Sequence, residues 1–83
     1  MSAQIYVGNI SYSMTDESLR KLFEEFGEVV SARVVKDRET DRSRGFAFVE
    51  MADPTAAQNA INQLDGSDVM GRNLKVNEAR PKN

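Results

Sequence analysis

One stretch of eight residues constrains the fold of this chain more than any other: positions 44–51 read Arg-Gly-Phe-Ala-Phe-Val-Glu-Met. Its residues alternate strictly in character, so a β-strand formed from them has two unlike faces. The first face is small and apolar and suits a protein core: Gly45, Ala47, Val49 and Met51. The second face places two large rings between two charges: Arg44, Phe46, Phe48 and Glu50.

The second face is predicted to point toward solvent. Charged side chains are almost never fully buried unless they are paired, so Arg44 and Glu50 disfavour burial of the face that they share with the two rings. Aromatic rings that a rigid strand presents to solvent suit the flat faces of unstacked nucleic-acid bases. We therefore interpret Phe46 and Phe48 as a stacking surface.

The composition narrows the class of protein. Eighty-three residues are enough for one domain, and 40% hydrophobic and 29% charged residues are typical of a globular chain. The chain has no cysteine and no histidine, which removes disulfides, thiolate sites and the commonest general base and metal ligand. We expect a protein that is not an enzyme and needs no metal or cofactor.

The distribution of charge and hydrophobicity bears on location and partners. No apolar run approaches the roughly 18 residues of a membrane span, and the start of the chain lacks the features of a signal peptide. We expect a cytoplasmic monomer, or a nuclear one in a eukaryote, and Met1 together with the lack of a linker favours a complete gene product. The net charge is −2, but residues 15–28 hold five acids against two bases and residues 29–49 hold five bases against three acids.

Alternation and turn residues predict the extended parts of the chain. Four strands are expected, over residues 4–8, 29–36, 44–51 and 73–78. A short strand or stub is expected over residues 67–70, and residues 37–43 form a loop because none of them is apolar. Within these strands the expected inward residues are Ile5, Val7, Val30, Ala32, Val34, Leu74 and Val76.

Two segments carry the signals of amphipathic helices. The first follows the capping residue Thr15 and ends at Gly27. Its apolar residues follow the i, i+3, i+4, i+7 pattern and predict a buried stripe: Leu19, Leu22, Phe23 and Phe26. The second helix begins at Asp53-Pro54 and closes at Asp65-Gly66. Its buried side is expected to consist of Ala56, Ala57, Ala60, Ile61 and Leu64.

The predicted order of elements is β-α-β-β-α-β, which is the ferredoxin-like split βαβ arrangement of the α+β class. In this fold two helices cover one face of a four-stranded antiparallel sheet and leave the other face open. Tyr6, Phe46 and Phe48 are then expected on the open face. We predict a single domain over residues 1–83, with a core from about 4 to 79 and loose ends at 1–3 and 80–83.

At two places the chain resembles the RNA recognition motif (RRM) family. Residues 44–51 match the longer family signature except at Met51, and residues 5–10, Ile-Tyr-Val-Gly-Asn-Ile, match the shorter one. Met51 points toward the helices by alternation, so this departure changes core packing rather than the open face. Within the family the chain looks similar to small stand-alone bacterial, especially cyanobacterial, RNA-binding proteins.

The resemblance implies a partner and a set of contacts. It implies non-catalytic binding of single-stranded RNA, with bases stacked on Tyr6, Phe46 and Phe48 and a phosphate contact from Arg44. The further candidate contacts lie in the shorter motif, on the open face by alternation, or in the tail: Asn9, Arg33, Lys75, Asn77 and Arg80. For these an ordinary surface role is the alternative.

Three other functions are compatible with the fold. Single-stranded DNA would stack on the same rings, and only a 2′-hydroxyl contact separates the two ligands. Some RRM-like domains bind proteins instead, usually after losing their sheet aromatics, whereas this chain keeps all three. An acylphosphatase-like hydrolase needs a basic residue in the turn after the first strand, and residues 9–15 contain none.

Overall fold

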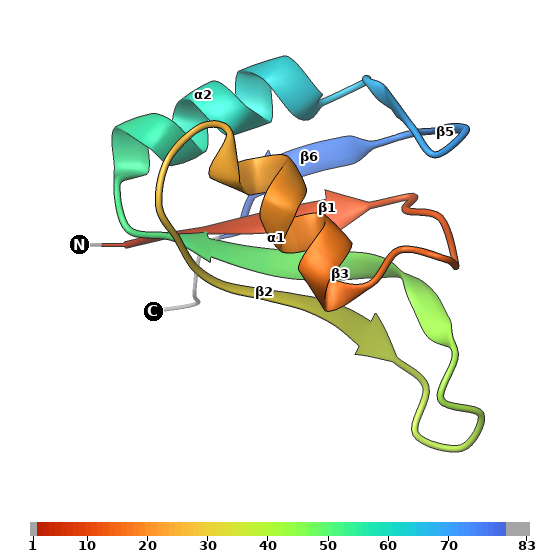
Figure 1. Cartoon of the computed structure of the whole chain (residues 1–83). Helices are drawn as coiled ribbons and strands as arrows, with labels where there is room; N and C mark the ends of the chain where they lie inside the picture. Colours follow the sequence, from red (N-terminus) through yellow and green to blue (C-terminus); the bar gives the residue numbers. More distant parts are fainter. Residues whose placement is uncertain (1, 80–83) are drawn as a thin grey trace.

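The computed structural model describes residues 2–79 and consists of one four-stranded antiparallel sheet, two helices and a small hairpin. The sheet has the strand order β2-β3-β1-β6. Its strands are β1 (Ala3–Gly8), β2 (Val29–Lys36), β3 (Ser43–Met51) and β6 (Lys75–Glu78). Helices α1 (Asp16–Glu24) and α2 (Pro54–Leu64) both lie on one face of this sheet (Figure 1). The predicted ferredoxin-like arrangement is confirmed.

The stub expected over residues 67–70 is part of a separate two-stranded hairpin. Strand β4 (Asp68–Val69) pairs with β5 (Arg72–Asn73), so the last strand of the main sheet begins at Lys75 rather than at Asn73. At the other end of the chain β1 begins at Ala3, which was expected to be loose, and Ala3 pairs with Met51.

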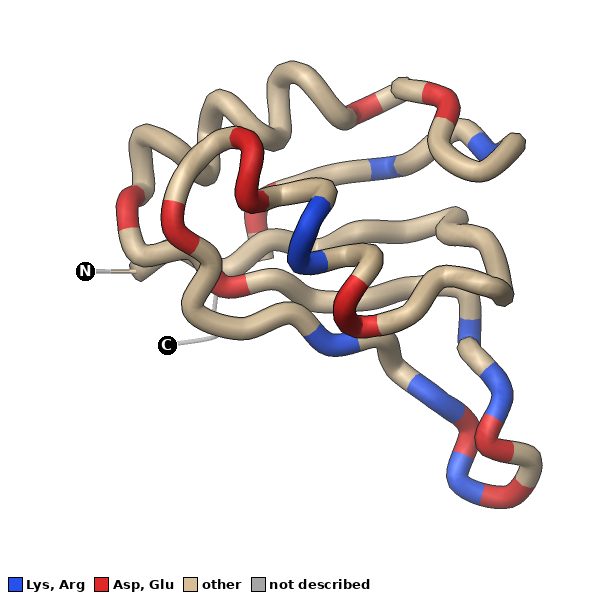
Figure 2. The backbone as a smooth tube through the Cα atoms, viewed as in Figure 1, with Lys and Arg blue, Asp and Glu red and all other residues tan. Residues whose placement is uncertain are grey.

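Charge is unevenly distributed over the backbone (Figure 2). Acidic residues lie at both ends of α1 and in the turn that follows it. The β2–β3 hairpin carries bases that alternate with acids at its tip. On α1 two exposed i,i+4 pairs, Glu17–Lys21 at 3.5 Å and Arg20–Glu24 at 3.8 Å, join opposite charges. Exposed pairs of this kind contribute little to stability, so they do little to hold α1 in place.

Both helices begin at the predicted caps. The Thr15 hydroxyl oxygen accepts a hydrogen bond from the Ser18 backbone N–H at 3.1 Å, and an Asp53 carboxylate oxygen accepts one from Thr55 at 3.0 Å. Helix α1 ends at Glu24, and a tighter turn carries the chain on to Gly27. A Cβ atom on Gly27 would lie 2.7 Å from the Cβ of Ala56, so glycine allows this turn to approach α2 closely.

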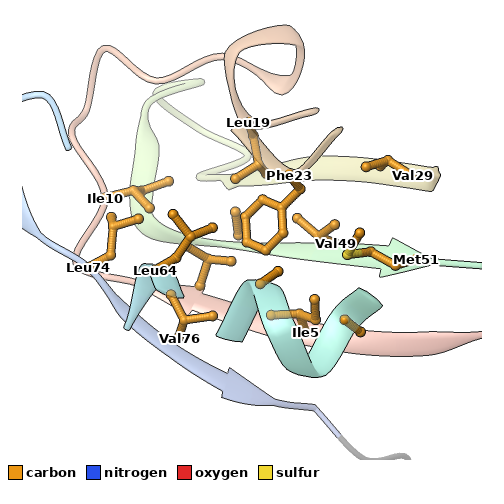
Figure 3. Packing of buried hydrophobic residues seen from close by; sticks show 14 of the residues in the cluster. Ile5, Ile10, Leu19, Phe23, Val29, Val49, Met51, Leu64, Leu74 and Val76 are labelled. Atoms are coloured by element: carbon orange, nitrogen blue, oxygen red, sulfur yellow. The ribbon is translucent and has the colours of Figure 1, made fainter. Parts of the chain in front are cut away.

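The core lies between the two helices and the covered face of the sheet (Figure 3). Leu19 and Phe23 of α1 are fully buried there, against apolar residues of β1, β3 and β6. Leu22 and Phe26 were also expected to be core, but they are only partly buried at its margin, as is Ile61 of α2. The apolar stripe of each helix thus extends beyond the part of the helix that is buried in the core.

A β-bulge changes the predicted faces of β2. Val29 pairs with Met51, and Ser31 pairs with Glu50, the neighbour of Met51 in β3. Val30 is therefore an extra residue without a partner. The expectation that Val30 points inward is therefore wrong, because the bulge turns it out to 48% exposure and Val29 is buried instead. Beyond the bulge the alternation is as predicted, and Val34 is buried.

Two carboxylates attach the helices to the edges of the sheet. An Asp16 oxygen, at the start of α1, accepts a hydrogen bond from the backbone N–H of Val34 in edge strand β2 at 2.8 Å. Asp65, directly after α2, does the same for Val76 in edge strand β6 at 3.0 Å. An edge strand presents backbone groups that would otherwise be unpaired, so each bond satisfies one N–H of an edge strand and helps to position a helix.

We expect Phe23→Ala to lower the free energy of unfolding by about 3–5 kcal/mol, because it empties a fully buried site in the core. Phe26→Ala removes the same ring from a partly buried site on the same side of the molecule and should cost clearly less. Urea unfolding of both variants measures the two losses. Equal losses would contradict the burial described for α1.

Candidate nucleic-acid interface

Three aromatic rings cluster on the face of the sheet opposite the core. The ring centroids of Tyr6 and Phe46 are 5.9 Å apart with planes inclined by 30°, and those of Tyr6 and Phe48 are also 5.9 Å apart. Phe46 and Phe48 complete the triangle at 6.0 Å, nearly perpendicular to each other. Within residues 2–79 both helices lie on the other face, so this cluster of rings is open to solvent (Figure 1).

The pairing of β1 with β3 creates this cluster. Tyr6 lies directly opposite Phe48, and Gly8 lies opposite Phe46. Directly opposed residues of neighbouring strands share a face. Phe48 is the most exposed of the three rings, at 43%, whereas Tyr6 and Phe46 are partly exposed and support it from the side.

Gly8 provides the space into which the Tyr6 ring leans. A Cβ atom on residue 8 would lie 2.7 Å from the Tyr6 hydroxyl oxygen and 2.9 Å from its Cε2. Such separations are well inside van der Waals contact. The backbone of Gly8 is not left-handed, so the tyrosine ring rather than the backbone is what requires a glycine here.

The register places polar side chains in line with the rings. One residue from each strand of the sheet falls in a single row: Arg33, Phe48, Tyr6 and Asn77. Arg33 and Asn77 thus flank the central rings on the two edge strands, and both are exposed. In the adjacent row Gly8 lies between Phe46 and the exposed Lys75.

Arg44 is exposed, but simple alternation does not decide which way it faces. The register of β3 against β2 is irregular between Ala47 and Ser43, and Gly45 adopts a left-handed conformation with φ of 87°. The strict alternation read from the sequence therefore ends at Gly45. Arg44 lies at the loop end of β3, next to the row that contains Phe46.

Asn9 makes structural contacts at the end of β1. Its Nδ2 donates to the carbonyl oxygen of Asn73 at 2.7 Å, and its Oδ1 accepts from Nη2 of Arg72 at 2.8 Å. Asn9 has a positive φ of 58°, which asparagine tolerates better than most residues. The predicted contact residue Asn9 therefore ties β1 to the β4–β5 hairpin. Arg80 lies outside the described residues.

A shallow hollow of about 280 Å³ lies beside Phe48 and contains residues that were not predicted as contacts. Gln4, Ser31 and Glu50 line it together with Arg33. Gln4 pairs with Glu50 across β1 and β3, one row away from Tyr6 and Phe48, and Glu50 also accepts a hydrogen bond from the hydroxyl of Ser2. The alternation of β1 and β3 already places Gln4 and Glu50 on the open face, and that signal could have identified them.

Between residues 2 and 79, no group of three or more His, Cys, Asp or Glu side chains is arranged to hold a metal ion. No helix in that same range has both the length and the apolar character needed to cross a membrane.

Comparison with known proteins agrees with this geometry. The family model described as RNA recognition motif matches residues 5–75. A protein of Nostoc sp., RbpE, which its name describes provisionally as RNA-binding, is 55% identical over 78 residues, covering 94% of this chain and 79% of its own. This chain belongs to the RNA recognition motif family.

Solved structures show the same arrangement. A crystal structure of an RNA binding protein, PG1, is 50% identical with a TM-score of 0.91 and covers 96% of this chain and 99% of its own. The protein of an SXL-lethal protein/RNA complex is 34% identical with a TM-score of 0.91, covering all of this chain and 50% of its own. The second of these similar chains was thus solved together with RNA.

The contact between Tyr6 and Gly8 predicts a coupling that a double-mutant cycle measures. In a Tyr6→Ala background, Gly8→Ala should raise the free energy of unfolding by about 0.4–1 kcal/mol, because it restricts the unfolded chain. With the tyrosine present the same change displaces the ring, so the gain should shrink or become a loss. Chemical unfolding of the wild type, the two single variants and the double variant gives the coupling free energy between residues 6 and 8. Equal gains in both backgrounds would show that the ring does not lie over Gly8.

Proposed function

We propose that this protein binds single-stranded RNA by stacking bases on Tyr6, Phe46 and Phe48, as a monomer and without catalysis. The observation that carries the proposal is the triangle of rings, with centroids about 6 Å apart, on the face of the sheet opposite the helices. Every base has a flat π-face, so such a cluster accepts two or three consecutive bases once they are unpaired.

The expected affinity follows from the number of stacked bases. Each base stacked on an aromatic ring contributes roughly 1–3 kcal/mol. Ordering a flexible strand takes back part of that gain. We expect a dissociation constant on the order of micromolar, near −8 kcal/mol.

The polar side chains around the rings supply the remaining contacts in this proposal. Arg33 and Asn77, in the same row as Tyr6 and Phe48, reach the edges of stacked bases from the two sides of the sheet. Lys75 and Arg44, near the loop end, contact phosphates. Glu50, beside Phe48, accepts hydrogen bonds from exocyclic amines, a chemistry that favours adenine, cytosine and guanine over uracil.

RNA is favoured over DNA as the ligand by the names of related proteins. A similar chain was solved in an RNA complex, and a Nostoc relative is named for RNA binding. The stacking itself does not distinguish the two polymers, whereas contacts to the 2′-hydroxyl do. A DNA pool of the same length, measured in parallel, therefore tests this part of the proposal.

Replacing Phe48 should weaken binding without unfolding the protein. We expect Phe48→Ala to reduce the affinity for a random-sequence RNA pool of ten nucleotides by roughly 1–3 kcal/mol, because one stacked base loses its ring. Phe48→Leu keeps apolar area but not the ring and should recover little. Fluorescence anisotropy of labelled RNA measures both variants.

Val30→Ala is the matched control for that experiment. Val30 is similarly exposed, at 48%, but lies on the bulge of β2 rather than among the rings. Its replacement should leave the affinity for RNA unchanged. Binding by Phe48→Ala that equals the wild type would remove the ring from the site and count against the proposal.

Replacing Arg44 should change the dependence of binding on salt. A phosphate contact to a single strand contributes about 0.7 to the slope of log K against log salt concentration, so Arg44→Ala should make the slope shallower by that amount. Lys21→Ala serves as the control, because Lys21 lies on α1 and pairs with Glu17. The same slope for wild type and Arg44→Ala would mean that Arg44 contacts no phosphate.

A further inference from the structure

An exposed aromatic residue lies outside the ring cluster on the sheet. Tyr12, in the loop between β1 and α1, is 71% exposed, more than any other large hydrophobic residue between residues 2 and 79. The guanidinium carbon of Arg72, in β5, lies 5.9 Å from the centroid of its ring, in the range of a cation–π contact. Two segments that are distant in sequence thus place a ring and a permanent positive charge together.

Arg72 is held in place beside this ring. Its Nη2 donates to Oδ1 of Asn9 at 2.8 Å, and the Nδ2 of Asn9 donates to the carbonyl oxygen of Asn73 at 2.7 Å. These bonds connect the end of β1 to the hairpin strand that carries the arginine. A guanidinium has five N–H donors, and the bond to Asn9 uses one of them. The side chain is therefore oriented and retains donors suited to a phosphate.

Tyr12 also borders an open groove of about 1110 Å³. The groove lies between the β1–α1 loop and the β2–β3 loop, and Lys36 and Arg42 line its far side. Of the acids in its lining, Asp16 is bonded to the N–H of Val34 and Glu17 is paired with Lys21. Asp41 is also in the lining. With bases and acids both present, stacking on the ring rather than net charge must provide most of any binding here.

The loop that carries Tyr12 leaves the sheet next to the row that contains Phe46. Gly8 ends β1 in the row of Phe46 and Lys75, and the β1–α1 loop, the β2–β3 loop and the β4–β5 hairpin all leave the sheet at that end (Figure 1). Tyr12 lies four positions after Gly8 in the sequence, so the chain limits the distance between their Cα atoms to about 14 Å. Stacked nucleotides advance by about 3.4 Å each, so at most about four nucleotides past the sheet are needed to span that distance.

We propose that Tyr12 and Arg72 form a second nucleotide site at the loop end of the sheet. A base of the same RNA strand stacks on the Tyr12 ring, and the Arg72 guanidinium contacts the adjoining phosphate. The proposal rests on the function proposed above, because it extends that strand beyond Tyr6, Phe46 and Phe48. It makes affinity depend on the length of the RNA and not only on its three stacked bases.

The first test compares RNA lengths. Random-sequence RNA pools of four and ten nucleotides are titrated against wild type, Tyr12→Ala, Tyr12→Phe and Arg72→Lys. Tyr12→Ala should weaken binding of the ten-nucleotide pool at least about fivefold, as for one lost stacking contact, and leave the four-nucleotide pool unaffected. Tyr12→Phe should bind both pools as the wild type does. Arg72→Lys should weaken only the longer pool, because lysine lacks the planar donor fork.

The second test observes the ring directly. The chain has two tyrosines and no tryptophan, so Tyr6→Phe leaves Tyr12 as the single tyrosine emitter while keeping a ring on the sheet. Its emission should be quenched by the ten-nucleotide pool and not by the four-nucleotide pool. In Tyr12→Phe the remaining emitter is Tyr6, which should be quenched by both pools.

The outcomes separate this inference from the proposed function. If wild type binds RNA, Phe48→Ala binds weakly and Tyr12→Ala binds the longer pool as wild type does, the second site is wrong and the sheet site stands. The same result is expected if Tyr12 instead contacts a protein partner. If RNA leaves Tyr6 emission unchanged and Phe48→Ala binds RNA as tightly as the wild type does, the sheet site itself fails and the second site fails with it.

Discussion

The hydrogen-bonded register between β1 and β3 is the constraint on which the rest of this structure depends. It sets Ile5 opposite Val49 beneath the sheet and Tyr6 opposite Phe48 above it. A slip of one residue would exchange the two faces of a strand, moving core residues into solvent and rings into the core. Burial of the apolar face thereby also determines where the rings lie. The stability of the core and the geometry of the proposed binding surface have the same physical origin.

The rings are supported by a sheet to whose two edge strands the helices are attached. Asp16 and Asp65 accept hydrogen bonds from the two edge strands, and Gly8 leaves room for the Tyr6 ring to lie along β1. A binding surface that is already ordered loses little conformational entropy when a ligand arrives. In the proposed complex the ordering cost would then fall mainly on the RNA strand, in line with the micromolar affinity that we expect.

The proposed stacking on three rings would explain binding of RNA but not the choice of sequence. Under the proposed function, discrimination between bases has to come from side chains that reach base edges. The rows of the sheet place Arg33, Asn77 and Glu50 beside the rings as candidates. Tyr12 and Arg72 would extend the contact toward the loops. In that arrangement the sheet would set the minimum length of RNA that binds, and the loops would determine how much affinity a longer RNA gains.

By itself the sequence determined the fold class and the three central rings, because alternation in β1 and β3 and the two helical stripes are local patterns set by the pleat and the helical turn. It did not predict the bulge that turns Val30 outward, nor the break at Gly45 that leaves the direction of Arg44 open, since an extra residue in a strand appears only once its partner is known. The contact of Arg72 with Asn9 joins residues 63 positions apart, and the position of Arg72 over Tyr12 depends on it. Only the folded chain decides such pairs, because packing of the hairpin against the end of β1, and no property of either segment alone, brings them together.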